Sequence, residues 1–114
     1  MNLVNLTPHP IVLACEDGSR ITVAASGTVA RVSSTPGALE RVEGVPVPVA
    51  ASTVFGAVEG LPAPAEGVGY IVSALVLARC GGRGDVFGPG TGPNDGAIRD
   101  DAGRIVAVTR LVRP

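Results

Sequence analysis

The sequence predicts a mainly β protein, either a small barrel or a curved antiparallel sheet of about eight short strands, with one short helix. Sixteen glycines and ten prolines interrupt the 114 residues at short intervals. The segments between them hold eighteen valines, and β-branched side chains favour strands. Because 46% of the residues are apolar, the chain can build one modest core, and we expect a single domain over residues 1–114.

The N-terminal third predicts short strands joined by turns. The prolines of Thr7-Pro8-His9-Pro10 exclude a helix there, and Glu16-Asp17-Gly18-Ser19 is typical of a hairpin turn. In the strand that follows Ser26-Gly27, alternation directs Arg31 away from Val32. The expected strands are residues 3–6, 11–15, 20–24 and 28–32.

The middle of the chain predicts a second hairpin after a polar break at residues 33–37. Its strands are residues 39–42 and 45–49, around a two-residue turn at Glu43-Gly44. Pro46 and Pro48 lack the N–H donor that a central strand needs, so this segment belongs at a sheet edge or a bulge. Residues 53–58 predict another strand, followed by a surface connection through residue 67.

Residues 70–72 predict a buried strand that runs into a short helix at residues 74–80. Ser73 is a suitable N-cap, and Gly81-Gly82 is a suitable stop. An unbroken buried strand through Ala78 is the alternative, because seven residues are too few to decide by periodicity.

Residues 81–96 are so rich in glycine and proline that we expect a long mobile loop. The chain then predicts a last hairpin, with strands at residues 97–100 and 104–111.

The charge pattern excludes several classes of function. Nine arginines and ten acidic residues give a net charge of −1, so no basic surface is available to hold nucleic acid. A chain without lysine has no Walker phosphate loop, Schiff base or lysine general base. One histidine and two cysteines do not form a zinc pattern, so we expect no metal and no cofactor.

The sequence also predicts a cytoplasmic protein. No charged and apolar leader opens the chain, and the longest apolar stretch, residues 68–78, is shorter than the roughly 20 residues that a membrane helix needs. We therefore expect no membrane contact, and we expect Cys15 and Cys80 to be free thiols.

Seven residues are candidates for a ligand site. Two arginines flank glycines whose amides can form an anion-binding nest, and guanidinium forks suit phosphate or carboxylate. The only histidine lies rigidly between two prolines and is the one side chain that ordinarily titrates near neutral pH. The candidates are Thr7, His9, Tyr70, Ser73, Arg79, Arg83 and Asp85.

Each candidate also has a purely structural interpretation. His9 and Thr7 are compatible with a turn in which their side chains bond the backbone. Arg79 is compatible with the C-terminal end of a helix, and Tyr70 with the core.

The remaining motifs give weaker evidence for a function. The triplet Arg83-Gly84-Asp85 suggests adhesion, which an intracellular location opposes. A Cys80 nucleophile would have only His9 as its base. Residues 88–93 do not complete a dinucleotide-binding glycine motif, and Asp100-Asp101 fits a hairpin tip better than a catalytic pair.

Several segments resemble an uncharacterised family of small proteins encoded by phages, prophages and bacteria. They are the opening Asn5-Leu6-Thr7-Pro8-His9-Pro10-Ile11, residues 56–62, residues 70–76, and pieces of residues 83–106. The resemblance covers most of the chain and implies a phage-related accessory protein made in the infected or lysogenic cell.

These observations lead us to expect a non-enzymatic homo-oligomer that binds a small anionic, nucleotide-like ligand. Such a protein would sequester a host defence signal. A small core and a proline-marked edge strand favour self-association. Two alternatives stay open. One is a virion or assembly component, or an antagonist that docks a host protein, and the other is an enzyme.

Overall fold

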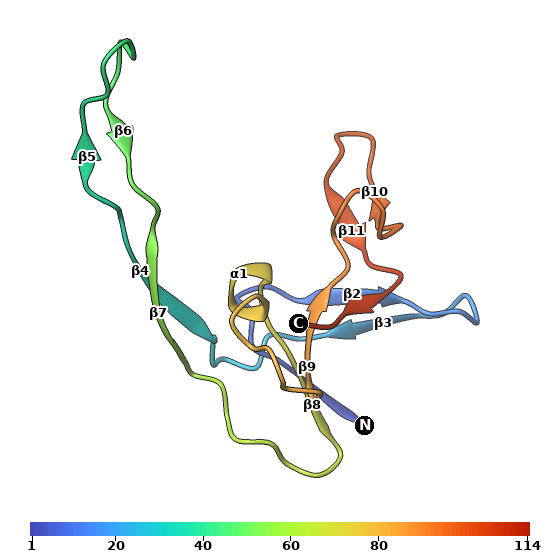
Figure 1. The fold of residues 1–114 in the computed structure, drawn as a ribbon. Coiled ribbons are helices and arrows are strands. Elements are labelled where there is room, and N and C mark those ends of the chain that lie inside the picture. The colour runs from blue at the N-terminus through green and yellow to red at the C-terminus, as the bar shows by residue number, and fades with distance from the viewer.

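The computed structural model describes residues 1–114 and confirms the mainly β class with one short helix. The sheets curve but do not close into a barrel (Figure 1). The strands are β1 (Asn2–Asn5), β2 (Ile11–Ala14), β3 (Arg20–Val23), β4 (Arg31–Thr35), β5 (Leu39–Glu40), β6 (Val49–Ala50), β7 (Val54–Glu59), β8 (Val68–Ile71), β9 (Val86–Pro89), β10 (Ile98–Arg99), β11 (Ile105–Ala107) and β12 (Leu111–Val112); the helix is α1 (Ala74–Leu77).

The largest sheet has four strands in the order β1-β8-β9-β12. β8 pairs in parallel with β1 and with β9, and β12 closes the sheet antiparallel to β9. This sheet is therefore mixed, whereas the expectation was antiparallel. The reason lies in the connections, because the chain between β8 and β9 passes through α1 and returns in the same direction.

The core sits where this sheet meets α1. Val72 and Val86 are fully buried there, and Leu6, Val76 and Leu77 pack beside them. β8 is buried along most of its length, as expected for a strand whose neighbours cover both edges.

The helix begins where the sequence predicts. The Ser73 side chain accepts a hydrogen bond from the Val76 N–H at 3.5 Å, and α1 runs only from Ala74 to Leu77. The alternative of a continuous strand through Ala78 is wrong. No helix of this protein has the length and apolar character needed to cross a membrane.

The structure corrects the expectation of a loop over residues 81–96. Val86–Pro89 form β9, which lies between β8 and β12, and Val86 is completely buried. Glycine makes this strand possible, because Gly88 and Gly90 are buried at positions where neighbouring side chains approach closely.

A long two-stranded ribbon, residues 31–59, leaves the body of the molecule (Figure 1). We call it the arm. β4 pairs with β7 at its base, and β5 pairs with β6 near its tip. The expected strand at 28–32 and break at 33–37 are displaced, since β4 spans Arg31–Thr35, and β7 bulges where Gly56 and Ala57 stand opposite Ser33. The serines and threonine there pair through backbone groups without needing burial.

Two further hairpins project from the body, and both were expected from the sequence. β2 pairs with β3 around the turn at Asp17-Gly18, and β10 pairs with β11 around Ala102-Gly103. The last strand of the chain, β12, separates from this hairpin and joins the main sheet.

Candidate functional site

Asn5 and Thr7 hold the turn that follows β1. The buried Asn5 amide donates to the carbonyls of His9 at 2.8 Å and Val23 at 3.0 Å. Its Oδ1 accepts from the Thr7 N–H at 2.9 Å and from the Thr7 hydroxyl at 2.6 Å. Because the hydroxyl proton of Thr7 is used inside the turn, this side chain acts in the fold and has only acceptor capacity left for a ligand.

His9 is exposed, and its side chain lines a different hollow from those of the other candidates. It lines a groove of about 330 Å³ together with Pro10, Ile11 and the strand residues Ile105 and Val106. We call this the His9 groove. None of the other six candidates lines it.

Arg83 and Asp85 form a bidentate ion pair. Arg83 Nε lies 2.8 Å from Asp85 Oδ1, and Nη2 lies 2.9 Å from Oδ2. The hydrogen bonds from Arg83 hold the pKa of Asp85 below its ordinary value, and those to Asp85 raise the pKa of Arg83. Arg83 Nη2 also donates to the Pro62 carbonyl at 3.0 Å, so most of its donors already have partners.

Tyr70 belongs to the same structural unit. Its ring is buried in the core, and its hydroxyl donates to the Ala63 carbonyl at 3.4 Å. Tyr70 and Arg83 thus hold neighbouring carbonyls of the segment that leads from the arm back to β8. The structure brings Tyr70, Arg83 and Asp85 together as a clamp on the chain.

Arg79 connects the helix region to the arm. Its guanidinium carbon lies 4.2 Å from the centroid of the Phe55 ring in β7. A cation over an aromatic face contributes about 0.5–1 kcal/mol at an exposed site. Arg79 therefore helps to set the direction in which the arm leaves the body.

The two cysteines are free, as the sequence predicts. Cys80 is buried, and its thiol donates to the Val76 carbonyl at 3.1 Å. Burial raises the pKa of this thiol, which favours the unreactive protonated form. Cys80 is thus a core residue.

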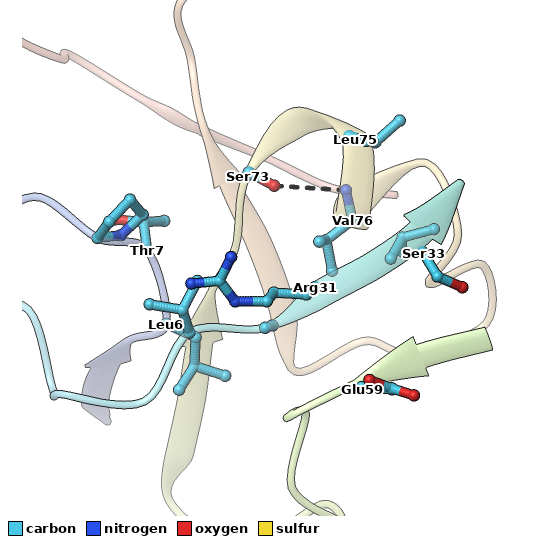
Figure 2. Close-up of a pocket in the computed structure, with 12 residues that line it drawn as sticks. Leu6, Thr7, Arg31, Ser33, Glu59, Ser73, Leu75 and Val76 are labelled. Carbon is cyan, nitrogen blue, oxygen red and sulfur yellow. Dashed lines mark hydrogen bonds between the residues drawn. The ribbon is translucent and has the colours of Figure 1, made fainter. Parts of the chain in front are cut away.

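A pocket of about 470 Å³ opens between the base of the arm and the start of α1. Figure 2 shows the Arg31 side chain reaching across it toward the segment that carries Ser73. The pocket combines an apolar wall with a few polar groups. Its lining residues are Leu6, Thr7, Pro8, Val29, Ala30, Arg31, Val32, Ser33, Glu59, Ser73, Leu75 and Val76.

Arg31 is the functional candidate that the sequence analysis missed. It stands opposite Glu59 in the register of β4 and β7. The ion pairs of the protein are nevertheless Arg83–Asp85 and Arg104–Asp100, so Arg31 has no carboxylate partner. Figure 2 shows its guanidinium turned away from Glu59. The available signal was the alternation that directs Arg31 away from the apolar Val32.

The seven candidates from the sequence thus fall into separate places. Thr7 and Ser73 line the pocket at the base of the arm, His9 lines the His9 groove, and Arg79 contacts the arm. Tyr70, Arg83 and Asp85 form the clamp. No three histidine, cysteine or acidic side chains come together as metal ligands.

Comparison of this chain with protein-family models, with curated proteins and with solved structures finds no match. The functional conclusion therefore depends on the geometry of the chain itself.

Proposed function

We propose that this chain is a non-enzymatic, phage-type accessory protein that works as a homo-oligomer and binds a small anion in the pocket at the base of the arm. The observation that carries the proposal is Arg31, a guanidinium directed into a pocket and left without a carboxylate partner. The planar guanidinium fork matches the oxygens of a phosphate or carboxylate group.

The other walls of the pocket support a ligand of the nucleotide type. Ser33 and Ser73 line the pocket with hydroxyl groups, that of Ser73 on the side toward which Arg31 reaches, and Glu59 offers a carboxylate that accepts hydrogen bonds from ligand hydroxyl or amino groups. Leu6, Leu75 and Val76 offer apolar contact. A ligand with an anionic group, hydroxyls and a flat apolar part would use all three surfaces.

Binding without turnover is favoured by what surrounds this pocket. The only histidine lies in a different groove, and the buried Cys80 thiol is held in its protonated form. Arg31, the serines and Glu59 can hold a ligand, but they do not make an activated nucleophile with its base. Sequestration of a host defence signal in the infected cell is the role that combines this binding with the resemblance to phage proteins.

The direct test is a calorimetric titration of the purified protein with adenosine monophosphate and with inorganic phosphate. We expect Arg31→Gln to weaken binding of both by at least about tenfold, since a charged hydrogen bond contributes about 1.5–3 kcal/mol. Arg20→Gln removes an exposed arginine of β3, outside the pocket, and should leave binding unchanged. Equal effects of the two substitutions, or no binding by the native protein, would contradict the proposal.

Ser73 provides a second test within the same pocket. Ser73→Asp keeps a side chain that can cap α1, and it adds a negative charge beside the anion site. We therefore expect unchanged thermal stability and weaker phosphate binding. Unchanged phosphate affinity in a folded Ser73→Asp protein would show that the anion binds elsewhere.

A structural or protein-interaction role is the second candidate, and the apolar arm favours it. It predicts a purified oligomer that carries no small molecule and that ignores both titrants. Native mass spectrometry of the protein as purified distinguishes the two functions.

A further inference from the structure

The chain exposes more surface than a compact protein of its mass. Its accessible area is 7455 Å², whereas a folded monomer of 11.4 kDa exposes about 5,800 Å². Its radius of gyration is 17.4 Å, against about 13 Å for a compact domain of this length. The excess area is about 1,700 Å² per chain.

Much of that excess belongs to the arm. Near its tip, β5 and β6 contact chiefly each other, and Figure 1 shows this part of the ribbon standing free of the body. A two-stranded ribbon alone is marginally stable in water. Half of the ten large apolar side chains that the protein exposes lie on the arm, namely Leu39, Val42, Val45, Val47 and Val54. The arm therefore has an apolar surface that the body of the same chain does not cover.

The arm is better suited to packing by side chains than to extending another sheet. Pro46 and Pro48 have no N–H donors, which interrupts the edge that a partner strand would pair with. In β7, Phe55 faces Arg79 of the body, and the neighbouring Val54 points to the opposite face, where it is 65% exposed. The free contacts of the arm include these apolar side chains, beside the exposed Glu40, Arg41 and Glu43.

The body carries an uncharged surface of matching character. The His9 groove contains no arginine, aspartate or glutamate, and Ile105 and Val106 on its rim are exposed. Residues 45–49 at the tip of the arm, Val-Pro-Val-Pro-Val, also contain no charged side chain. A contact confined to residues 45–49 and the groove buries no ion, whereas Glu40, Arg41 and Glu43 of the preceding strand and turn have to stay in water.

The size of the excess fits a second copy of this chain as the partner. If two chains exchange arms, the dimer has two equivalent contacts, and a standard contact buries about 800 Å² on each side. Each chain would then bury about 1,600 Å², once through its own arm and once through its body. This value is close to the excess of about 1,700 Å². A two-fold arrangement is also the commonest symmetry of soluble oligomers.

We infer that the outer arm, residues 38–54, packs on the body of a second copy of this chain, with the tip at residues 45–49 in the His9 groove, and that the second copy returns the same contact. The inference deepens the homo-oligomeric part of the proposed function and does not depend on the anion site. Arg31 lies at the base of the arm, so exchange would also fix the wall of the pocket that Arg31 and Glu59 form.

Light scattering on the full chain tests the exchange. We expect a mass of twice 11.4 kDa for the native protein and of one chain for Val47→Glu, which places a charge in the apolar contact. Ser34→Glu places the same charge at an exposed polar position of β4, outside residues 38–54, and should leave the dimer intact. A native protein of single-chain mass, or a dimer that survives Val47→Glu, would overturn the inference.

Crosslinking tests which surfaces meet. In a Cys15→Ser background we would mix two chains, one with Val47→Cys and one with Val106→Cys, under mild oxidation. We expect a disulfide that joins the two different chains, while Val47→Cys mixed with Ala102→Cys, at the tip of the β10–β11 hairpin, should give none. Equal yields from both pairs would overturn the placement of the tip. Phosphate titration of the Val47→Glu protein separates this result from the anion site, because Arg31 is unchanged in it.

Discussion

Arg83 Nε lies 2.8 Å from Asp85 Oδ1, and the same guanidinium donates to the Pro62 carbonyl at 3.0 Å. The Arg-Gly-Asp triplet is therefore an internal clamp that ties the start of β9 to the segment between the arm and β8. In this structure the side chains of the triplet hold the fold together, whereas Arg31, which lines the pocket at the base of the arm, has no ion-pair partner.

The Arg83–Asp85 pair should make stability depend on acid pH. The pKa of Asp85 in the folded chain lies below the ordinary value of 3.8, chiefly because Arg83 hydrogen-bonds to it. Its contribution to the free energy of unfolding is therefore complete above 3.8 and is lost as the pH falls through the folded pKa. We expect Asp85→Asn to destabilise the protein at pH 7 and to flatten the loss of stability toward about pH 2 in urea unfolding curves.

The contribution of Asp17 to this pH dependence of stability must be measured separately, because the pKa of Asp17 is also lowered, chiefly by the hydrogen bond from the Ser19 hydroxyl. Asp17→Asn should remove only the part of the acid-dependent loss of stability that comes from the hairpin turn between β2 and β3.

The losses of stability caused by Arg83→Gln and by Asp85→Asn should not add in the double variant, since each substitution removes the same ion pair. Additive losses would show that the two residues act independently.

Asn5 should be the most sensitive polar position of the chain. Asn5→Ala removes the amide donor from the Val23 carbonyl and the acceptor from the buried Thr7 N–H, while the Thr7 hydroxyl can still donate to the His9 carbonyl. Each unsatisfied buried group costs about 1–3 kcal/mol, a large part of the 5–15 kcal/mol that typically holds a domain together.

The matched control is Asn2→Ala, in the same strand but exposed, which should change the free energy of unfolding by no more than about 0.5 kcal/mol. Urea unfolding followed by circular dichroism measures both variants. A similar small effect at Asn5 and Asn2 would show that water replaces the amide and that the turn does not depend on it.

The sequence predicts the parts of this fold that are specified locally. The Ser73 cap and the turn at Asp17-Gly18 each follow from a few neighbouring residues. The hairpin expected at 39–42 and 45–49 is shorter, because β5 and β6 pair only at Leu39–Glu40 and Val49–Ala50 and both prolines lie in the connection. The parallel pairing of β8 with β1 and β9 joins segments far apart in the chain, and local patterns do not encode which strands meet. The same limit explains β4, whose exposed polar residues pair through the backbone and leave no apolar pattern.

For the candidate site, too, the local sequence indicates some features and only the fold shows the others. Sequence spacing drew attention to Arg83, but its partner Pro62 lies in a distant segment, and only the fold shows that its donors are occupied. Arg31 carries no local motif, and it becomes a candidate because β4 passes beside the start of α1. What decides between a structural and a binding arginine is the presence of a partner, which spacing along the chain does not reveal.

A substitution at Gly88 tests strand β9, which the sequence predicts as a loop because residues 81–96 are rich in glycine and proline. A Cβ at Gly88 would lie 2.7 Å from Leu77 Cδ2 of the helix, so Gly88→Ala must displace a buried side chain at the contact between β9 and α1. Overpacking of this kind costs about 1–3 kcal/mol. Gly81→Ala is the control, because a Cβ there meets nothing within 4 Å and the residue needs no left-handed backbone. In urea unfolding we expect a clear loss for Gly88→Ala and almost none for Gly81→Ala. If residues 86–89 were a mobile loop, the two alanines would be tolerated equally, and the assignment of β9 to the main sheet would fail.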